Sequence, residues 1–153
     1  MASVVASEPL LKRLIREGFI AQVSKPGLHS DLKELFNSLS GTYFYVNIEG
    51  KDGGNWLYKI VAQNGRVRID ERALSELDSP EYRDSHFILA LPDWVIYDAL
   101  LGEMALEEAL DHASWGGGLA SHPTWTFLKM STLLEHFESL LDRQKIIRLV
   151  RGR

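Results

Sequence analysis

The feature that most constrains the fold is a change of hydrophobic period near residue 42. Before it, apolar residues recur every three or four positions, as on one face of a helix, whereas from Thr42 to Glu49 they alternate, as along a strand. Asn64–Gly65, which suits a tight hairpin turn, then separates two further runs, 55–62 and 66–70. We therefore expect a three-stranded meander, with Phe44 on the strand face that looks toward the core.

Two short helices are predicted ahead of these strands. Residues 8–17 have apolar side chains at helical spacing, and Gly18 is placed to end that helix. Ser30 is a suitable N-cap and is followed by acidic residues, which favour the first turn of a helix. The second helix is therefore expected over 31–39.

The region after the meander is expected to return to the sheet once and then become helical. Residues 71–84 are polar and turn-rich, and 85–91 (SHFILAL) is typical of a fourth strand. Pro92 and Asp93 favour a helix start, and Gly102 a helix end. A short helix is predicted over 105–110.

The last third of the chain contains a glycine run and a long amphipathic helix. Residues 115–119 are expected to be extended or irregular, because adjacent glycines are poor in helix interiors, and they are a candidate fifth strand. The helix begins near Pro123 and becomes basic in its final turns. Its apolar face comprises Phe127, Met130, Leu134, Phe137 and Leu141. This order of elements predicts an α+β domain with helices covering one face of a largely antiparallel sheet.

Composition excludes several classes of protein. The 153 residues have room for one main domain. The absence of cysteine excludes disulfides, thiolate metal sites and a cysteine nucleophile. No secretory leader is evident, and no apolar stretch approaches the roughly 20 residues of a membrane-spanning helix. We expect a soluble, cytoplasmic protein.

The formal net charge of −4 hides two regions of opposite sign. Residues 70–111 contain twelve acidic side chains against two arginines, which is typical of a solvated acidic surface and argues against nucleic-acid binding there. Residues 142–153 contain five basic side chains against one acidic. Two interpretations of this tail stay open: contact with anionic lipids or an acidic partner, and a helix end packed on its own domain.

No motif for catalysis or metal binding is present, so we expect no cofactor, no metal and no catalytic residue. The histidines do not have the spacing of a zinc site. Asp111–His112 with His122 is a distant option for an enzyme, and Gly116–Gly118 are better explained as a loose loop than as an anion nest. The five histidines are His29, His86, His112, His122 and His136.

The tryptophans fall in four different predicted elements. Large aromatic side chains usually fill a core, but the same residues can line an apolar cavity between sheet and helices. The sequence alone leaves both interpretations open. The four residues are Trp56, Trp94, Trp115 and Trp125.

One combination of these elements resembles a known family. Trp56–Ile60, the Asn64–Gly65 turn with Arg66–Arg68, and above all Phe87–Trp94 with the helix that ends at Leu101–Gly102 are similar to the sterol carrier protein type two superfamily. The similarity covers about Ser30 to Leu141 in element order. Small single-domain members of this type occur in actinobacteria, and the chain resembles them in size.

The resemblance implies a five-stranded sheet and an apolar tunnel for fatty acyl chains or sterols, without catalytic residues. It also implies a core at 30–141, an N-terminal helical extension at 1–29 and a basic tail at 142–153. The chain departs from the family pattern at residues 113–121, where Trp115 and the glycines are expected to reshape or plug the tunnel mouth. The predicted ligand-binding residues are Trp56, Tyr58, Trp94, Leu100, Trp115, Phe127, Met130, Leu134 and Phe137.

Three hypotheses follow. The first is a non-enzymatic binder or carrier of a lipid or other apolar small molecule, such as a fatty acyl chain or a sterol. The second is a protein-interaction module with a filled or reshaped cavity that binds no lipid. The third and most distant is an enzyme that uses His112 and His122. Peripheral membrane contact through the basic tail is compatible with the first.

Overall fold

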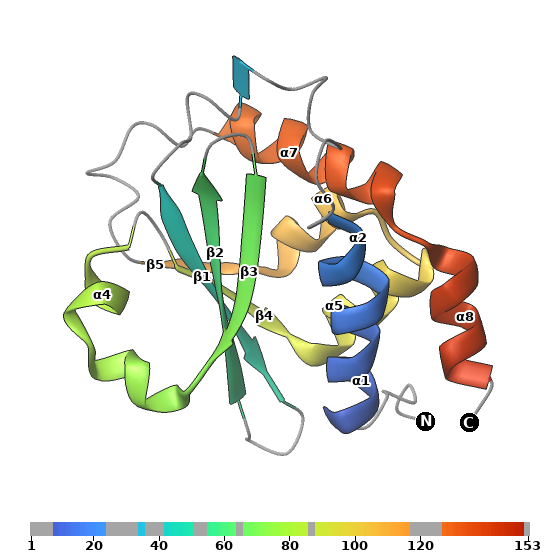
Figure 1. Cartoon of the computed structure of the whole chain (residues 1–153), viewed down its shortest axis with the longest axis horizontal. Coiled ribbons are helices and arrows are strands. Elements are labelled where there is room, and N and C mark those ends of the chain that lie inside the picture. The colour runs from blue at the N-terminus through green and yellow to red at the C-terminus, as the bar shows by residue number, and fades with distance from the viewer. Residues whose placement is uncertain are drawn as a thin grey trace.

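The fold is one sheet with helices on both of its faces, and Figure 1 shows their arrangement. The computed structural model describes residues 8–23, 34–35, 42–50, 55–63, 66–85, 88–116 and 127–151. The predicted helix over 31–39 lies outside this range except for residues 34 and 35, which are helical. The expected Asn64–Gly65 turn is also outside it.

The predicted three-stranded meander is confirmed. Its strands pair antiparallel, β1 with β2 and β2 with β3. Gln63 lies opposite Arg66, so two residues connect β2 to β3, as the turn dipeptide predicts. The strands are β1 (Tyr43–Glu49), β2 (Asn55–Gln63) and β3 (Arg66–Arg72).

The sheet is mixed, so the prediction of a largely antiparallel sheet is wrong. β4 (Ile88–Pro92) joins the free side of β1 and runs parallel to it, with Tyr45 opposite Ile88. Between β3 and β4 the chain passes over one face of the sheet. The order of elements alone therefore does not determine whether β4 runs parallel or antiparallel to β1. Four strands of five to nine residues form the body of the sheet. Within the described residues, the three-residue β5 (Ser114–Gly116) extends it at the edge beside β4.

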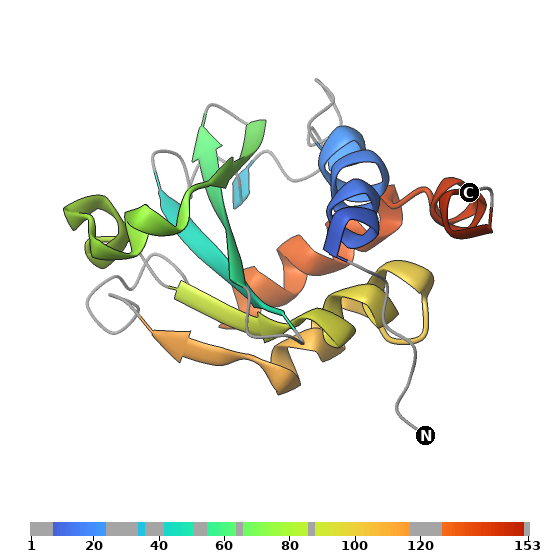
Figure 2. The same cartoon turned by 90° about the horizontal axis from the view of Figure 1, so that it is seen from below.

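The larger helical layer covers the face of the sheet that carries Phe44, Val46 and Ile48, called here the inner face (Figure 2). The helix predicted after Pro92 is confirmed, and Gly102 ends it with a φ of 88°, a conformation that favours glycine. The helices after β4 in this layer are α5 (Asp93–Leu101), α6 (Leu106–Ala109), the short 3₁₀ helix η4 (Leu110–His112) and α7 (Phe127–Leu140).

The N-terminal helix is longer than predicted, because Gly18 does not end it. α1 (Glu8–Leu14), the π-helical η1 (Ile15–Ile20) and α2 (Ala21–Val23) follow one another without a break. A Cβ atom at Gly18 would overlap Cγ1 of Ile146. Glycine is therefore required here for close helix packing rather than for a turn.

The basic tail is a separate helix, α8 (Arg143–Arg151), and not the last turns of α7 as predicted. The chain leaves helical geometry at residues 141 and 142, and the Asp142 carboxylate then accepts a hydrogen bond from the Lys145 amide at 3.0 Å, as an N-cap does. Arg143 donates to the Ala99 carbonyl oxygen of α5 at 3.1 Å. Of the two interpretations of this tail, its packing on its own domain is therefore observed, and membrane contact stays a prediction.

Both terminal helices share the hydrophobic core of the sheet. Leu11, Leu14 and Ile146 are fully buried and belong to the same cluster of buried residues as Phe44 and Leu89. The predicted boundaries at residues 29 and 141 stay predictions, but the described helices on either side of them pack as one body with the strands.

A smaller layer covers the opposite, outer face of the sheet, so the expectation of helices on one face only is wrong. It consists of the 3₁₀ helix η3 (Leu74–Asp78) and α4 (Pro80–Arg83). The Tyr45 hydroxyl donates to Glu76 at 3.0 Å, and its ring meets that of Tyr82 edge to face at 4.9 Å. The polar segment 71–84 therefore covers the large aromatic rings on this face and shields them from water.

Candidate functional site

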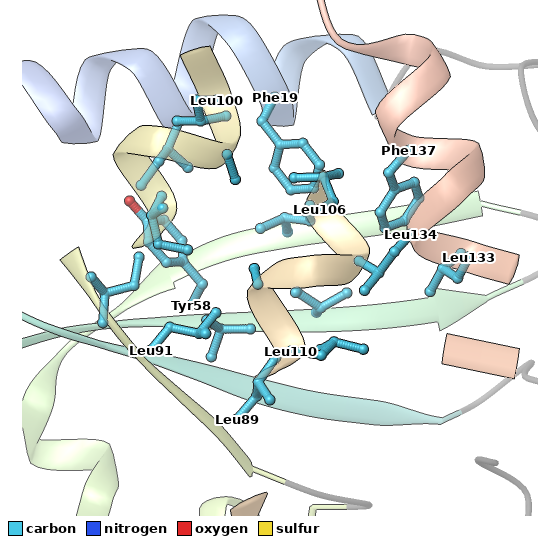
Figure 3. A pocket seen from close by; sticks show the side chains of 18 of the residues that line it. Phe19, Tyr58, Leu89, Leu91, Leu100, Leu106, Leu110, Leu133, Leu134 and Phe137 are labelled. Atoms are coloured by element: carbon cyan, nitrogen blue, oxygen red, sulfur yellow. The ribbon is translucent and has the colours of Figure 1, made fainter. Parts of the chain in front are cut away.

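An apolar cavity of about 120 Å³ lies between the inner face of the sheet and the helices. Figure 3 shows its side chains pointing toward one another from the strands and from several helices. The strands place alternate residues on this side, which is why the cavity wall repeats with a period of two along each of them. The strand residues that line it are Phe44, Val46, Ile48, Tyr58, Ile60, Ile69, Leu89 and Leu91.

The helical side of the cavity is equally apolar. It is formed by Ile15, Phe19, Ile96, Ala99, Leu100, Leu106, Ala109, Leu110, Leu133, Leu134 and Phe137. Among the described residues that line the cavity, Tyr58 is the one with a polar side-chain atom, and it is 5% exposed. Such a wall offers dispersion contacts and the hydrophobic effect, and none of its described residues has a carboxylate, imidazole or amine.

Four of the predicted ligand-binding residues meet at this cavity: Tyr58, Leu100, Leu134 and Phe137. Trp56 is on the same face of β2 as Tyr58 and is 4% exposed, but it does not line the cavity. The Lys12 ammonium lies 5.7 Å from the centre of its ring instead.

Trp94 lies away from the cavity, and 38% of its surface is exposed. Its ring packs against exposed His112, with 5.0 Å between ring centres. The inward face of α5 carries Ile96, Ala99 and Leu100, and Trp94 is on another side of the helix. Trp94 is therefore not part of the described cavity wall.

Three further predicted site residues cannot be placed at the atomic level. Trp115 lies in β5, and Phe127 and Met130 lie in α7, but their side chains are outside the described part of the chain. The suggestion that Trp115 and the glycine run plug the cavity mouth stays a prediction.

The N-terminal helix supplies cavity residues that the sequence analysis missed. Ile15 and Phe19 line the cavity from η1, and the Phe19 ring meets Phe137 of α7 edge to face, with centroids 5.6 Å apart. The apolar stripe of this helix could have predicted this, because the apolar face of a helix packs against the core of the domain.

The acidic middle of the chain is partly neutralised by partners within the protein. Glu71 pairs with Lys12 at 3.1 Å, Glu76 with Arg72 at 2.5 Å, and Glu81 with Lys59. Glu107 accepts a hydrogen bond from Ser131 of α7 at 3.0 Å. These carboxylates hold elements together, so the region is only in part the solvated acidic surface that its composition predicts.

The described residues do not gather the features that an enzyme or a protein-interaction module would need into one site. No three acidic or histidine side chains gather there to hold a metal, and His122 lies outside that range. The exposed large apolar residues among them, Leu74 and Trp94, belong to different elements. None of the described helices is long and apolar enough to cross a membrane.

Comparisons with known proteins agree on the fold. No protein-family model and no curated protein matches the chain. Sterol carrier protein 2 from Yarrowia lipolytica, solved in its apo form, is 11% identical, with a TM-score of 0.55 over 90% of this chain and 98% of the other. A conserved hypothetical protein from Thermus thermophilus, described as possibly a sterol carrier protein, is 9% identical, with a TM-score of 0.52 over 95% and 92%.

A third solved structure is similar over a comparable length. Sterol carrier protein-2 like-3 from Aedes aegypti is 14% identical, with a TM-score of 0.50 over 89% of this chain and 99% of the other. At such identities the likeness concerns backbone architecture and not the residues of a site. The mixed sheet, its helical layer and these neighbours together show that the chain has the fold of sterol carrier protein type two.

Proposed function

We propose that the protein binds and carries a lipid or other apolar small molecule in the cavity between sheet and helices. The main support is the apolar cavity wall, in which Tyr58 is the one described residue with a polar side-chain atom. The shared fold with proteins named sterol carriers supports it. In this proposal the protein is a cytoplasmic carrier and not an enzyme.

An empty cavity of this kind is costly, which supports a role in binding. At roughly 24 cal/mol per Å³, a void of 120 Å³ lowers stability by about 3 kcal/mol. Protein interiors normally leave few voids larger than a water molecule. A ligand that fills the space recovers contacts that the lining side chains lack.

The size of the cavity sets what it can hold without movement. An apolar cavity of about 150 Å³ accommodates benzene, so this one fits an apolar group of similar size. A longer acyl chain requires the lining side chains to move apart. About ten buried methylenes at about 0.8 kcal/mol each give about 8 kcal/mol, which corresponds to micromolar affinity before the cost of association is subtracted.

Filling the cavity by mutation tests the proposal. Ala109 is 6% exposed and lines the cavity, so Ala109→Leu should occupy the space that a ligand needs. We expect dodecanol to bind at least about tenfold more weakly to this variant than to the wild type, measured by calorimetric titration. Ala73→Leu is the matched control, because Ala73 is exposed and distant from the cavity wall.

Three outcomes are informative. Loss of binding in Ala109→Leu, with the control unchanged and the circular dichroism spectrum retained, supports the proposal. Equal binding to all three proteins shows that the ligand lies elsewhere. If wild-type protein binds neither dodecanol nor cholesterol and native mass spectrometry finds no co-purifying lipid, the proposed function is wrong.

A further inference from the structure

One part of the cavity wall belongs to the N-terminal helix, residues 8–23, which lies between the sheet and α8 in both Figure 1 and Figure 2. Its middle segment, η1, contributes Ile15 and Phe19 to the cavity. Figure 3 shows the Phe19 ring next to Phe137 of α7. A molecule larger than benzene fits only if some part of the wall moves.

Other parts of the wall are tied to their neighbours by polar contacts. The strands are joined by hydrogen-bonded ladders. α6 is tied to α7, because the Leu106 amide donates to Glu138 at 2.8 Å and the Ser131 hydroxyl donates to Glu107 at 3.0 Å. Separating these elements breaks hydrogen bonds, which is costly wherever the freed groups stay buried.

The η1 segment is tied more weakly. No described residue hydrogen-bonds it to another element, since Arg13 and Gln22, which donate to Glu17, belong to the same helix. One turn earlier, Lys12 pairs with Glu71 of β3 at 3.1 Å, and both side chains are partly exposed. Such surface pairs contribute little to stability. Mainly apolar contacts therefore keep η1 in the wall.

α8 holds η1 from the side away from the sheet. Ile146 of α8 is fully buried and packs against Gly18, where a Cβ atom would overlap it. α8 is in turn fixed to α5, because Arg143 donates to the Ala99 carbonyl oxygen at 3.1 Å. η1 is also π-helical, and such turns are rare and occur frequently at functional sites. The Gly18–Ile146 contact thus joins a weakly tied part of the wall to a fixed helix.

We propose that the N-terminal helix is the lid of the cavity and that α8 is the latch that keeps this lid closed. The inference rests on the proposed function. In the closed state, Ile146 packs against Gly18 and keeps Ile15 and Phe19 in the wall. A ligand enters and leaves when η1 separates from Ile146 and from Phe137.

A disulfide between η1 and α8 tests the latch. The chain has no cysteine of its own, and a Cβ atom at residue 18 would lie 3.8 Å from Cβ of Ile146, which matches the spacing in disulfides. Oxidised Gly18→Cys/Ile146→Cys should bind and release dodecanol at least about tenfold more slowly than the same protein after reduction. Stopped-flow tryptophan fluorescence measures both rates. The Kd should stay unchanged, because a closed lid slows entry and exit alike.

Hydrogen exchange tests the lid without a ligand. In the wild-type protein, the amides of η1 should exchange faster than those of β1 and β2, as expected for a segment that opens locally. In the double variant, oxidation should slow exchange in η1 at least about tenfold and leave the strand amides unchanged.

A second variant opens the latch instead of closing it. Ile146→Ala removes the side chain that packs against Gly18, so dodecanol should bind and dissociate at least about threefold faster. Leu57→Ala is the matched control, because Leu57 is also fully buried but lies on the outer face of β2, beside Lys59 in the alternation of that strand. It should leave both rates unchanged.

The outcomes separate the lid from the function on which it rests. If the disulfide changes neither hydrogen exchange in η1 nor the dodecanol rates, or if Leu57→Ala accelerates dodecanol exchange as much as Ile146→Ala, the lid is overturned while binding in the cavity stands. Slower hydrogen exchange with unchanged dodecanol rates also overturns it, because the ligand then enters elsewhere. If the wild-type protein binds neither dodecanol nor cholesterol, both the function and the lid are overturned.

Discussion

The two faces of the sheet are built from the same strands and packed in opposite ways. On the inner face, Val46 and Tyr58 lie opposite each other and line the apolar cavity. On the outer face, Tyr45 lies opposite Lys59, and both are held by side chains of the η3–α4 layer. One face therefore encloses space, and the other is fixed by directed interactions.

The difference separates the tasks of the two layers. Hydrogen bonds, ion pairs and edge-to-face rings have preferred geometries, so the outer layer holds the strands in one arrangement. Contacts across the cavity wall are apolar and non-directional, so the lining side chains can shift around a ligand without losing a polar bond to the sheet. By holding the strands in place, the outer layer also keeps the sheet side of the cavity in one arrangement.

The largest expected effect comes from removing the central ring of the outer face. Tyr45 is fully buried, contacts Tyr82 and Tyr43, and donates to Glu76. Tyr45→Ala should lower the free energy of unfolding by about 4 kcal/mol, within the range for deleting a buried aromatic ring. Urea denaturation measures this, and a loss below about 1 kcal/mol would contradict the picture of a tightly packed outer face.

A smaller effect on the free energy of unfolding, which depends on pH, should distinguish the contribution of the Tyr45 hydroxyl from that of its ring. Burial, followed by the hydrogen bond to Glu76, raises the pKa of Tyr45, and burial also raises the pKa values of Tyr43 and Tyr82. The folded state thus keeps protons that the unfolded state loses above a pKa of about 10. The stabilising contribution is complete below pH 10 and declines above it, by up to about 1.4 kcal/mol per pH unit for each tyrosine.

Tyr45→Phe isolates one of these contributions. It should cost about 1 kcal/mol at pH 7, for the lost hydrogen bond, and reduce the slope of unfolding free energy against pH between 10 and 11. Burial, and next the charge of Arg72, lowers the pKa of Lys59, which gives a slope of the opposite sign in both proteins, so the comparison cancels it. Identical slopes for wild type and variant would mean that Tyr45 ionises freely.

The smallest effect is expected at the rim of the outer face. Lys59 pairs with Glu81, whose side chain is 42% exposed, and the Lys59 ammonium also lies 4.8 Å from the centre of the Tyr43 ring. Glu81→Gln should therefore lower the free energy of unfolding by less than about 1 kcal/mol, as for other exposed pairs. A loss of several kcal/mol, by the same urea assay, would show that this ion pair and not the buried rings anchors α4.

Local patterns predicted much of the fold. Alternation over β1 and β2, the two-residue connection to β3 and the helix from Asp93 to Leu101 all depend on residues close in sequence, and they were correct. The direction of β4 depends instead on where the intervening chain passes. Gly18 was misinterpreted for the same reason, since its partner, Ile146, lies far away in sequence.

The site was harder to predict than the fold. Tyr58, Leu100, Leu134 and Phe137 do line the cavity, because periodicity shows which side of an element is buried, and their role in binding stays a prediction. Periodicity does not show whether the buried side chains meet or leave a space. Trp94 lies outside the cavity wall, which the sequence did not indicate, because an aromatic residue near a helix start suits either the interior or the surface.

The parallel pairing of β1 with β4 has a consequence for the order in which the chain folds. The meander from Tyr43 to Arg72 pairs strands that are neighbours in sequence, whereas Tyr45 pairs with Ile88, 43 positions along the chain. Closing that longer loop loses more chain entropy before the strand contacts form and offset the loss. Such distant pairings therefore slow folding. We expect the meander to form first and β4 to dock onto its exposed edge last, so the cavity comes into existence only at the final step.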